Sequence, residues 1–173
     1  MTKICINGGH FVGVDPGAIG SRITEAELAL DLMGRVAAYL EAAGCEVLTV
    51  HRSELEDICA ASNEWGADLF VSIHCNAANR NARGTETFCY YGAGEGDALA
   101  HHIQSQIVTS LGTVDRGVKE AGFYVLRYTD CPAVLVETAF IDNTEDEMLL
   151  IDNTDEFARA IARGVTDYIT REQ

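Results

Sequence analysis

Three side chains that can bind a metal ion or carry a proton each end a short apolar run of the sequence. They are His10, His74 and Glu137. Imidazole and carboxylate groups are ligands of Zn²⁺, and a carboxylate beside a metal can also move protons. Open α/β sheets bind ligands beyond the carboxyl ends of their strands, so the three side chains are expected to meet at one edge of a sheet. The pattern predicts a metal-centred active site.

A fourth candidate lies at a predicted helix start. Thr24 and Glu27 have the spacing of a capping box, in which the Glu27 carboxylate bonds the backbone. Glu25 is the other first-turn carboxylate and the better candidate to reach the site, although the helix dipole favours an acidic residue there even without chemistry. Two histidines and one glutamate match the open ligand set of a catalytic zinc. Glu137 ends a buried run, where an unpaired carboxylate is costly, and is the candidate acid/base.

Other polar residues have simpler explanations. His101 and His102 fall in a helix of mixed polarity and His51 at a strand end, so surface or edge positions are expected. Asp15, before Pro and Gly, is first a turn residue. Cys75 should point to the opposite sheet face from the histidine before it. The six cysteines show no disulfide framework or CxxC pair and are expected to be reduced thiols. The absence of HExxH, GxSxG and P-loop motifs removes the usual support for those enzyme classes.

Hydrophobic periodicity predicts the elements that position these residues. Strands are expected over 3–7, 46–50, 68–74, 84–91 and 133–137, and helices from Thr24 to a stop at Gly44, over 53–65 and 97–111, after Asn143, and over 154–170, with an irregular segment at 112–130. Strands alternating with helices predict an α/β fold: a three-layer, mostly parallel twisted sheet with helices on both faces. The length of 173 residues fits a single catalytic domain over 1–173.

Charge and hydropathy exclude two kinds of partner. The chain has 12 Lys and Arg against 27 Asp and Glu, a formal net charge of −15. Nucleic acid and anionic membranes attract basic proteins, so neither is expected to bind. No apolar stretch approaches the ~20 residues that span a bilayer, and the first residues lack the features of a signal peptide. We expect a protein made in a reducing cytoplasm, with no membrane insertion.

Motifs from Ile4 to about Tyr168 follow the order of one known family. They are Gly9-His10 with Asp15 to Gly20, Thr24 to Leu28, Ala67 to Ala77, Gly84 to Glu86, Asp115 to Lys119, Phe123 to Arg127, and Pro132 to Asn143. On these motifs the chain resembles the zinc-dependent N-acetylmuramoyl-L-alanine amidases of the type 3 class, found in cell-wall hydrolases and phage endolysins. It departs from the usual His-Gly-Gly-x-Asp-Pro-Gly, because Phe11 replaces a glycine in a loop one residue longer. It also has Val50-His51-Arg52 where members of the family usually have Leu-Thr-Arg.

The resemblance implies one zinc ion held by His10, Glu25 and His74, with Glu137 as the catalytic acid/base. The family cuts the amide that joins the lactyl group of N-acetylmuramic acid to L-alanine in peptidoglycan, which is therefore the expected partner. Asn76, Arg116 and Arg127 match family positions near the groove and are candidate substrate-binding residues. We expect a monomer that acts on the cell wall after release or export.

Two other functions stay open at the level of sequence. A zinc peptidase or carboxypeptidase of related architecture would cut a bond within the stem peptide. A non-catalytic wall-binding module would keep a structural zinc, although a structural site has a closed ligand shell and no spare carboxylate such as Glu137.

Overall fold

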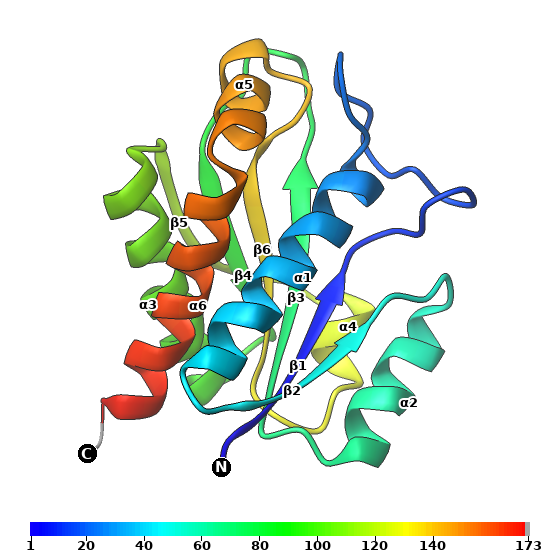
Figure 1. Cartoon of the computed structure of the whole chain (residues 1–173), viewed down its shortest axis with the longest axis vertical. Helices are drawn as coiled ribbons and strands as arrows, with labels where there is room; N and C mark the ends of the chain where they lie inside the picture. The colour runs from blue at the N-terminus through cyan, green and yellow to red at the C-terminus, as the bar shows by residue number, and fades with distance from the viewer. Residues whose placement is uncertain (172–173) are drawn as a thin grey trace.

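A six-stranded sheet forms the centre of the computed structural model, which describes residues 1–171 (Figure 1). The strands are β1 (Lys3–Gly8), β2 (Glu46–Val50), β3 (Leu69–Asn76), β4 (Thr85–Cys89), β5 (Asp115–Glu120) and β6 (Ala133–Phe140). Their order is β2-β1-β3-β6-β4-β5, and among these strands only β4 and β6 pair antiparallel. The mostly parallel sheet expected from the sequence is confirmed. The last two residues of the predicted 1–173 domain lie outside the described residues.

Helices cover both faces of the sheet, as predicted. They are α1 (Glu25–Ala42), α2 (Leu55–Trp65), α3 (Gly94–Leu111), α4 (Tyr124–Arg127), α5 (Thr144–Asp152) and α6 (Thr154–Thr170). Helices α1, α6 and α3 lie side by side on one face (Figure 1), where they bury the apolar side chains of Ile4, Val71 and Val136. The short helices α2 and α4 pack on the other face through Ile58 and Leu126. They leave part of that second face open, beside the carboxyl-terminal half of β3.

The start of α1 is set by the capping box that the sequence predicts. Thr24 is the N-cap: its backbone N–H donates to the Glu27 carboxylate at 3.0 Å, and the Glu27 N–H donates to the Thr24 hydroxyl at 3.3 Å. Leu28 and Leu32 then bury the face of α1 that packs on the sheet. The neighbouring carboxylate, Glu25, turns inward and is only 3% exposed. One local motif thus fixes both the helix start and the direction of a buried acid.

The two strands that carry the central site residues are longer than the sequence predicts. His74 lies within β3 and Glu137 within β6, and the two residues are register partners on adjacent strands. The expectation that both residues end their strands is therefore wrong. The apolar runs mark the buried part of each strand, whereas backbone pairing continues through polar residues to Asn76 and Phe140. The two side chains still lie side by side, because register partners share one face of the sheet.

The segment at 112–130, predicted to be irregular, contains β5 and α4. Strand β5 was missed because its residues, Asp115 to Glu120, are mostly charged or polar, as is common for an edge strand that faces water. Helices α2 and α3 begin at Leu55 and Gly94 instead of 53 and 97. None of the helices described in residues 1–171 is long and apolar enough to cross a membrane.

Candidate active site

The loop after β1 brings His10 against His74. The Gly9 N–H donates to the carbonyl of Ile73 in β3 at 2.9 Å, which ties the start of this loop to the neighbouring strand. A Cβ at Gly9 would overlap the imidazole of His74, so only glycine allows this approach. His10 itself has a φ of 62°, a left-handed conformation that is uncommon for a side-chain-bearing residue. The two imidazole rings meet edge to face, with centroids 5.2 Å apart.

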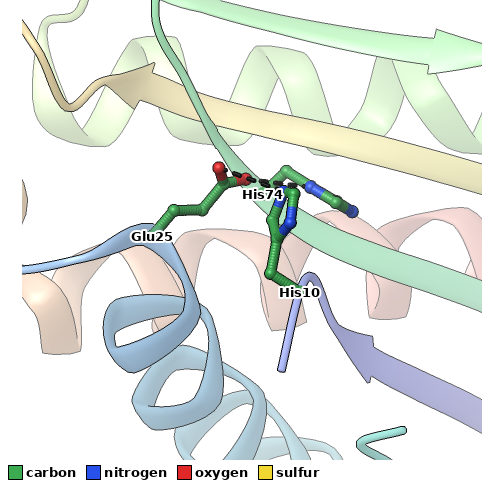
Figure 2. Close-up of side chains that lie close together, drawn as sticks. All are labelled: His10, Glu25 and His74. Carbon is green, nitrogen blue, oxygen red and sulfur yellow. Dashed lines mark hydrogen bonds and ion pairs between the residues drawn. The ribbon is translucent and has the colours of Figure 1, made fainter. Parts of the chain in front are cut away.

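The Glu25 carboxylate lies between the two imidazoles (Figure 2). Its Oε2 is 3.1 Å from Nε2 of His10 and accepts a hydrogen bond from the Ala18 N–H at 2.8 Å. Its Oε1 is 2.9 Å from Nδ1 of His74 and accepts from the Cys75 N–H at 3.0 Å. Both oxygens are therefore held by backbone donors while they face a histidine. A helix start, a loop and a strand each supply one member of the group.

Asp15 orients His10 from the far side of its ring. Its Oδ2 lies 2.7 Å from His10 Nδ1, and its Oδ1 accepts from the Gly17 N–H at 3.0 Å. Gly17 has a φ of 64°, and a Cβ there would lie 2.5 Å from His10 Cδ2 and 2.6 Å from Glu25 Oε2. Asp15 thus acts both as the predicted turn residue and as the partner that points His10 Nε2 toward Glu25.

The electrostatics of this group favour a positive charge among its members. Burial opposes ionisation of Glu25, yet its hydrogen bonds with His10 and His74 hold its pKa well below the usual range. The hydrogen bond to Glu25, together with that to Asp15, raises the pKa of His10 to about 9 against the opposing effect of burial. A proton on His10 therefore serves as counter-ion to a buried carboxylate. A metal cation at the same place would supply that charge instead.

The donor atoms of His10, Glu25 and His74 fit a metal ion. One ligand atom from each residue lies within 4.8 Å of the others, and no other such group of three is present in residues 1–171. Two imidazole nitrogens and one carboxylate oxygen leave at least one further position for water or substrate, as in an open catalytic site. The structure therefore brings together the three residues that the sequence singled out.

Glu137 stands beside this group as an acid without hydrogen-bond partners. Its Oε2 is buried and has no partner in the described residues. Burial, with a smaller contribution from the carboxylates of Glu25 and Glu86, raises the pKa of Glu137 to about 8 against the opposing effect of His10. Glu86 is the register partner of Glu137 on β4, so the two acids share one face of the sheet. A carboxyl group with a pKa near neutrality can both accept and return a proton.

A cavity of about 510 Å³ joins these residues into one site. His10, His74 and Glu137 form part of its wall, and Leu55, Ile58, Phe123, Tyr124, Val125 and Leu135 form an apolar side contributed by α2, α4 and β6. Arg52 and Ser53, at the start of the segment that leads into α2, also line the cavity. The site can therefore hold an extended ligand with its reacting bond between the histidines and Glu137.

The three candidate substrate residues lie outside the wall of this cavity. Asn76 donates to Glu86 Oε1 at 2.6 Å, and Arg116 donates to Glu86 Oε2 at 3.0 Å. Arg127 stacks over the ring of Tyr128 and borders a separate cavity. The structure gathers two of these residues around Glu86 and does not bring Arg127 to the site.

The sequence did not show the roles of Asp15 and Glu86. Asp15 had a usable signal, because it follows His10 closely and precedes a Pro-Gly turn. Glu86 accepts from Asn76, Arg116 and Lys119, and no local pattern shows that these residues meet. The other expectations hold: all six cysteines are free, and His101 is exposed on α3.

The chain is similar to known proteins over nearly its whole length. A family model described as "N-acetylmuramoyl-L-alanine amidase" matches residues 4–167. The N-acetylmuramoyl-L-alanine amidase LytC of Bacillus subtilis is 39% identical over 174 residues, which cover 95% of this chain and 35% of LytC. The chain thus spans about a third of the length of that relative.

Solved structures share the whole fold. The N-acetylmuramoyl-L-alanine amidase from Clostridium difficile 630 is 31% identical, with a TM-score of 0.93 over 99% of this chain and 98% of that one. AmiC2 of Nostoc punctiforme, also an N-acetylmuramoyl-L-alanine amidase, is 32% identical, with a TM-score of 0.91 over 98% of both chains.

Proposed function

Because the chain belongs to the N-acetylmuramoyl-L-alanine amidase family, we propose that it hydrolyses the amide between the lactyl group of N-acetylmuramic acid and L-alanine in peptidoglycan. The observation that carries this proposal is the buried, unpartnered carboxyl group of Glu137 beside the group of His10, Glu25 and His74. A proton carrier next to an open set of metal ligands is the arrangement that metal-assisted hydrolysis requires.

We propose zinc as the ion. His10, Glu25 and His74 would hold it, because one ligand atom from each lies within 4.8 Å of the others and zinc takes imidazole nitrogen and carboxylate oxygen as ligands. When bound, zinc supplies Lewis acidity, which polarises the scissile carbonyl and makes a water molecule more acidic.

The residues of the chain then divide the reaction between them. Glu137 takes the proton of the attacking water as the water oxygen bonds to the lactyl carbonyl carbon. It returns that proton to the amide nitrogen as the carbon–nitrogen bond breaks, so that L-alanine leaves as an amine and muramic acid keeps a carboxylate. Asp15 holds His10 in its ligand orientation, and the apolar wall around Ile58 excludes water from one side of the bond.

The products of purified peptidoglycan test the reaction. We expect the zinc-loaded protein to release free stem peptides with an L-alanine amino terminus, identified by mass spectrometry. Glu137→Gln should bind zinc but lower turnover by about 100-fold or more. Cleavage within the stem peptide would instead identify a peptidase, and wall binding without any product would identify a binding module. Either result would overturn the proposal.

Metal content tests the ligand set separately. The purified protein is expected to hold one zinc ion, and His74→Ala to lose it. His101→Ala, which removes an exposed imidazole on α3, serves as the matched control and should keep the metal. We further propose that the protein acts at the cell wall. We also propose that it is a monomer, which analytical ultracentrifugation can check.

A further inference from the structure

Arg52 is the one lysine or arginine among the side chains that line the active-site cavity in residues 1–171. It lies just after β2, whereas Glu86 and the cations that pair with it lie on β4 and β5, outside the lining. The other charged groups of the lining, apart from the histidines, are the acids Asp15 and Glu137. Arg52 is therefore the charge of this wall that can receive a substrate anion.

The Arg52 guanidinium is not neutralised by the protein. Its Nη1 donates to the backbone carbonyl of Asp57 at 3.3 Å, and no ion pair joins it to a carboxylate in the described residues. The candidates from sequence differ in this respect. Arg116 pairs with Glu86, and Arg127 borders another cavity. A cation that faces a cavity without an acidic partner is available to a ligand.

A ring contact holds the segment that carries Arg52. His51, the residue before it, packs against Phe11 with ring centroids 4.7 Å apart. Phe11 follows the metal-ligand candidate His10 directly. The contact thus joins the segment after β2 to the loop after β1 and keeps Arg52 at the cavity mouth. Phe11 and His51 both occupy positions at which the sequence differs from the family motifs.

The substrate of the proposed reaction carries an anion close to the scissile bond. In peptidoglycan, L-alanine is followed by a γ-linked D-glutamyl residue whose α-carboxyl group is free in some walls and amidated in others. Standard backbone dimensions place this group roughly 6 Å from the scissile nitrogen. Arg52 and Glu137 line the same cavity of about 510 Å³, so both the anion and the scissile bond can lie within it.

We propose that Arg52 binds the free α-carboxylate of the second stem residue, so that the enzyme prefers non-amidated stem peptides. This inference rests on the proposed amidase function. Arg52 is a specificity residue in this role and takes no part in proton transfer. Because the contact forms equally in the bound substrate and in the transition state, it should lower KM and leave kcat nearly unchanged.

Three soluble N-acetylmuramoyl tripeptides test the preference. The first has a free α-carboxyl group at its second residue, the second has an α-carboxamide there, and the third has the free α-carboxyl group but a carboxamide at its C-terminus. We expect kcat/KM for the second to be about three- to tenfold lower than for the first, the size of a partly exposed ion pair. The third should match the first.

Variants assign the preference to Arg52. In Arg52→Gln the ratio between the first two substrates should fall toward one, through a higher KM for the first, and Arg52→Lys should restore part of it. Arg163→Gln removes an exposed cation of α6 and should keep the wild-type ratio. Equal rates for the first two substrates in the wild type, an unchanged ratio in Arg52→Gln, or discrimination against the third substrate alone would overturn the inference.

Binding measurements keep this test separate from the proposed function. Calorimetry of the same peptides with Glu137→Gln reports the preference without turnover. A protein that binds the free α-carboxylate peptide more tightly but cleaves none of the three would support Arg52 and contradict the amidase. Cleavage of the first two substrates at the muramoyl bond at equal rates would support the amidase and contradict the role of Arg52.

Discussion

Single residues should decide how strongly the proposed zinc ion is held. Asp15 contacts Nδ1 of His10, whereas Glu25 contacts Nε2 on the other side of the ring. Partners of this kind fix the ring orientation and the basicity of a ligand, and their loss typically weakens metal binding by 10–100-fold. Asp15→Asn is therefore expected to raise the zinc dissociation constant by about that factor in a titration with a competing chelator. Asp31→Asn, on the exposed face of α1, is the control. Equal affinity in both variants would contradict the role of Asp15.

The pKa of Glu137 makes a second prediction, for the metal-free protein. Burial raises this pKa from 4.5 to about 8, so folding favours the protonated form. The contribution of Glu137 to the free energy of unfolding is therefore fully present below about pH 4.5, where the carboxyl group is protonated in both states. It is lost as the pH rises to about 8. Glu137→Gln, which stays neutral, should match the wild type in stability near pH 4 and exceed it by about 4 kcal/mol at pH 8.

Denaturant unfolding at the two pH values checks this expectation. Glu41→Gln, which removes an exposed acid at the end of α1, should show no comparable gain at pH 8. If Glu137→Gln were no more stable than the wild type at pH 8, burial would not raise the pKa of this carboxyl group as expected.

The sequence could predict the residues whose chemistry is unusual for their local setting. His10 and His74 beside glycine and small residues, Glu25 beside a capping box, and Glu137 in an apolar run each carry such a signal. It could not predict Arg52 or Glu86. Their significance depends on which charges are paired across the sheet, and pairing between β4 and β5 or between loops has no local pattern.

Among the elements, the start of α1 links helix stability to the metal site. Loss of an N-cap costs about 1 kcal/mol, and the first turn of α1 carries Glu25. Thr24→Ala should therefore lower the free energy of unfolding by about 1 kcal/mol and also weaken zinc binding. Gly44→Ala is a matched change just past the other end of the same helix, where φ is +88° and a Cβ meets no atom within 4 Å.

Backbone strain at Gly44→Ala should cost about 1–2 kcal/mol and leave zinc binding unchanged. Equilibrium unfolding and metal titration of both variants separate the two effects. Parallel losses of zinc affinity in the two proteins would mean that global stability, and not the local start of α1, controls the site.

Element types were predictable where apolar periodicity was strong. The alternation of strands and helices through Asn76 follows the expected order, and the capping box placed a helix start correctly. Strand β5 and helix α4 escaped prediction because their stability comes from neighbours: β5 is an edge strand paired with β4, and α4 is one short turn that packs on α2 and β6.

At the scale of the whole molecule, the net charge of −15 opposes approach to an anionic wall. Cell walls carry carboxylate and phosphate groups, and salt screens repulsion between like charges. We expect the rate of wall clearing to rise by about two- to fivefold as ionic strength increases from about 0.01 to 0.15 M. Cleavage of a soluble muramoyl peptide without extra anionic groups should show no such rise. A wall rate that falls over this range would contradict the expectation.

The position of β6 affects the order in which the site is assembled during synthesis. His10, Glu25 and His74 lie in the loop after β1, at the start of α1 and on β3, whereas Glu137 lies on the last strand, which enters the sheet between β3 and β4. A ribosome that adds roughly 5–20 residues per second delivers the ligands several seconds before Glu137. The nascent chain therefore exposes the three candidate metal ligands first, and the candidate proton carrier joins them only when the last strand closes the sheet.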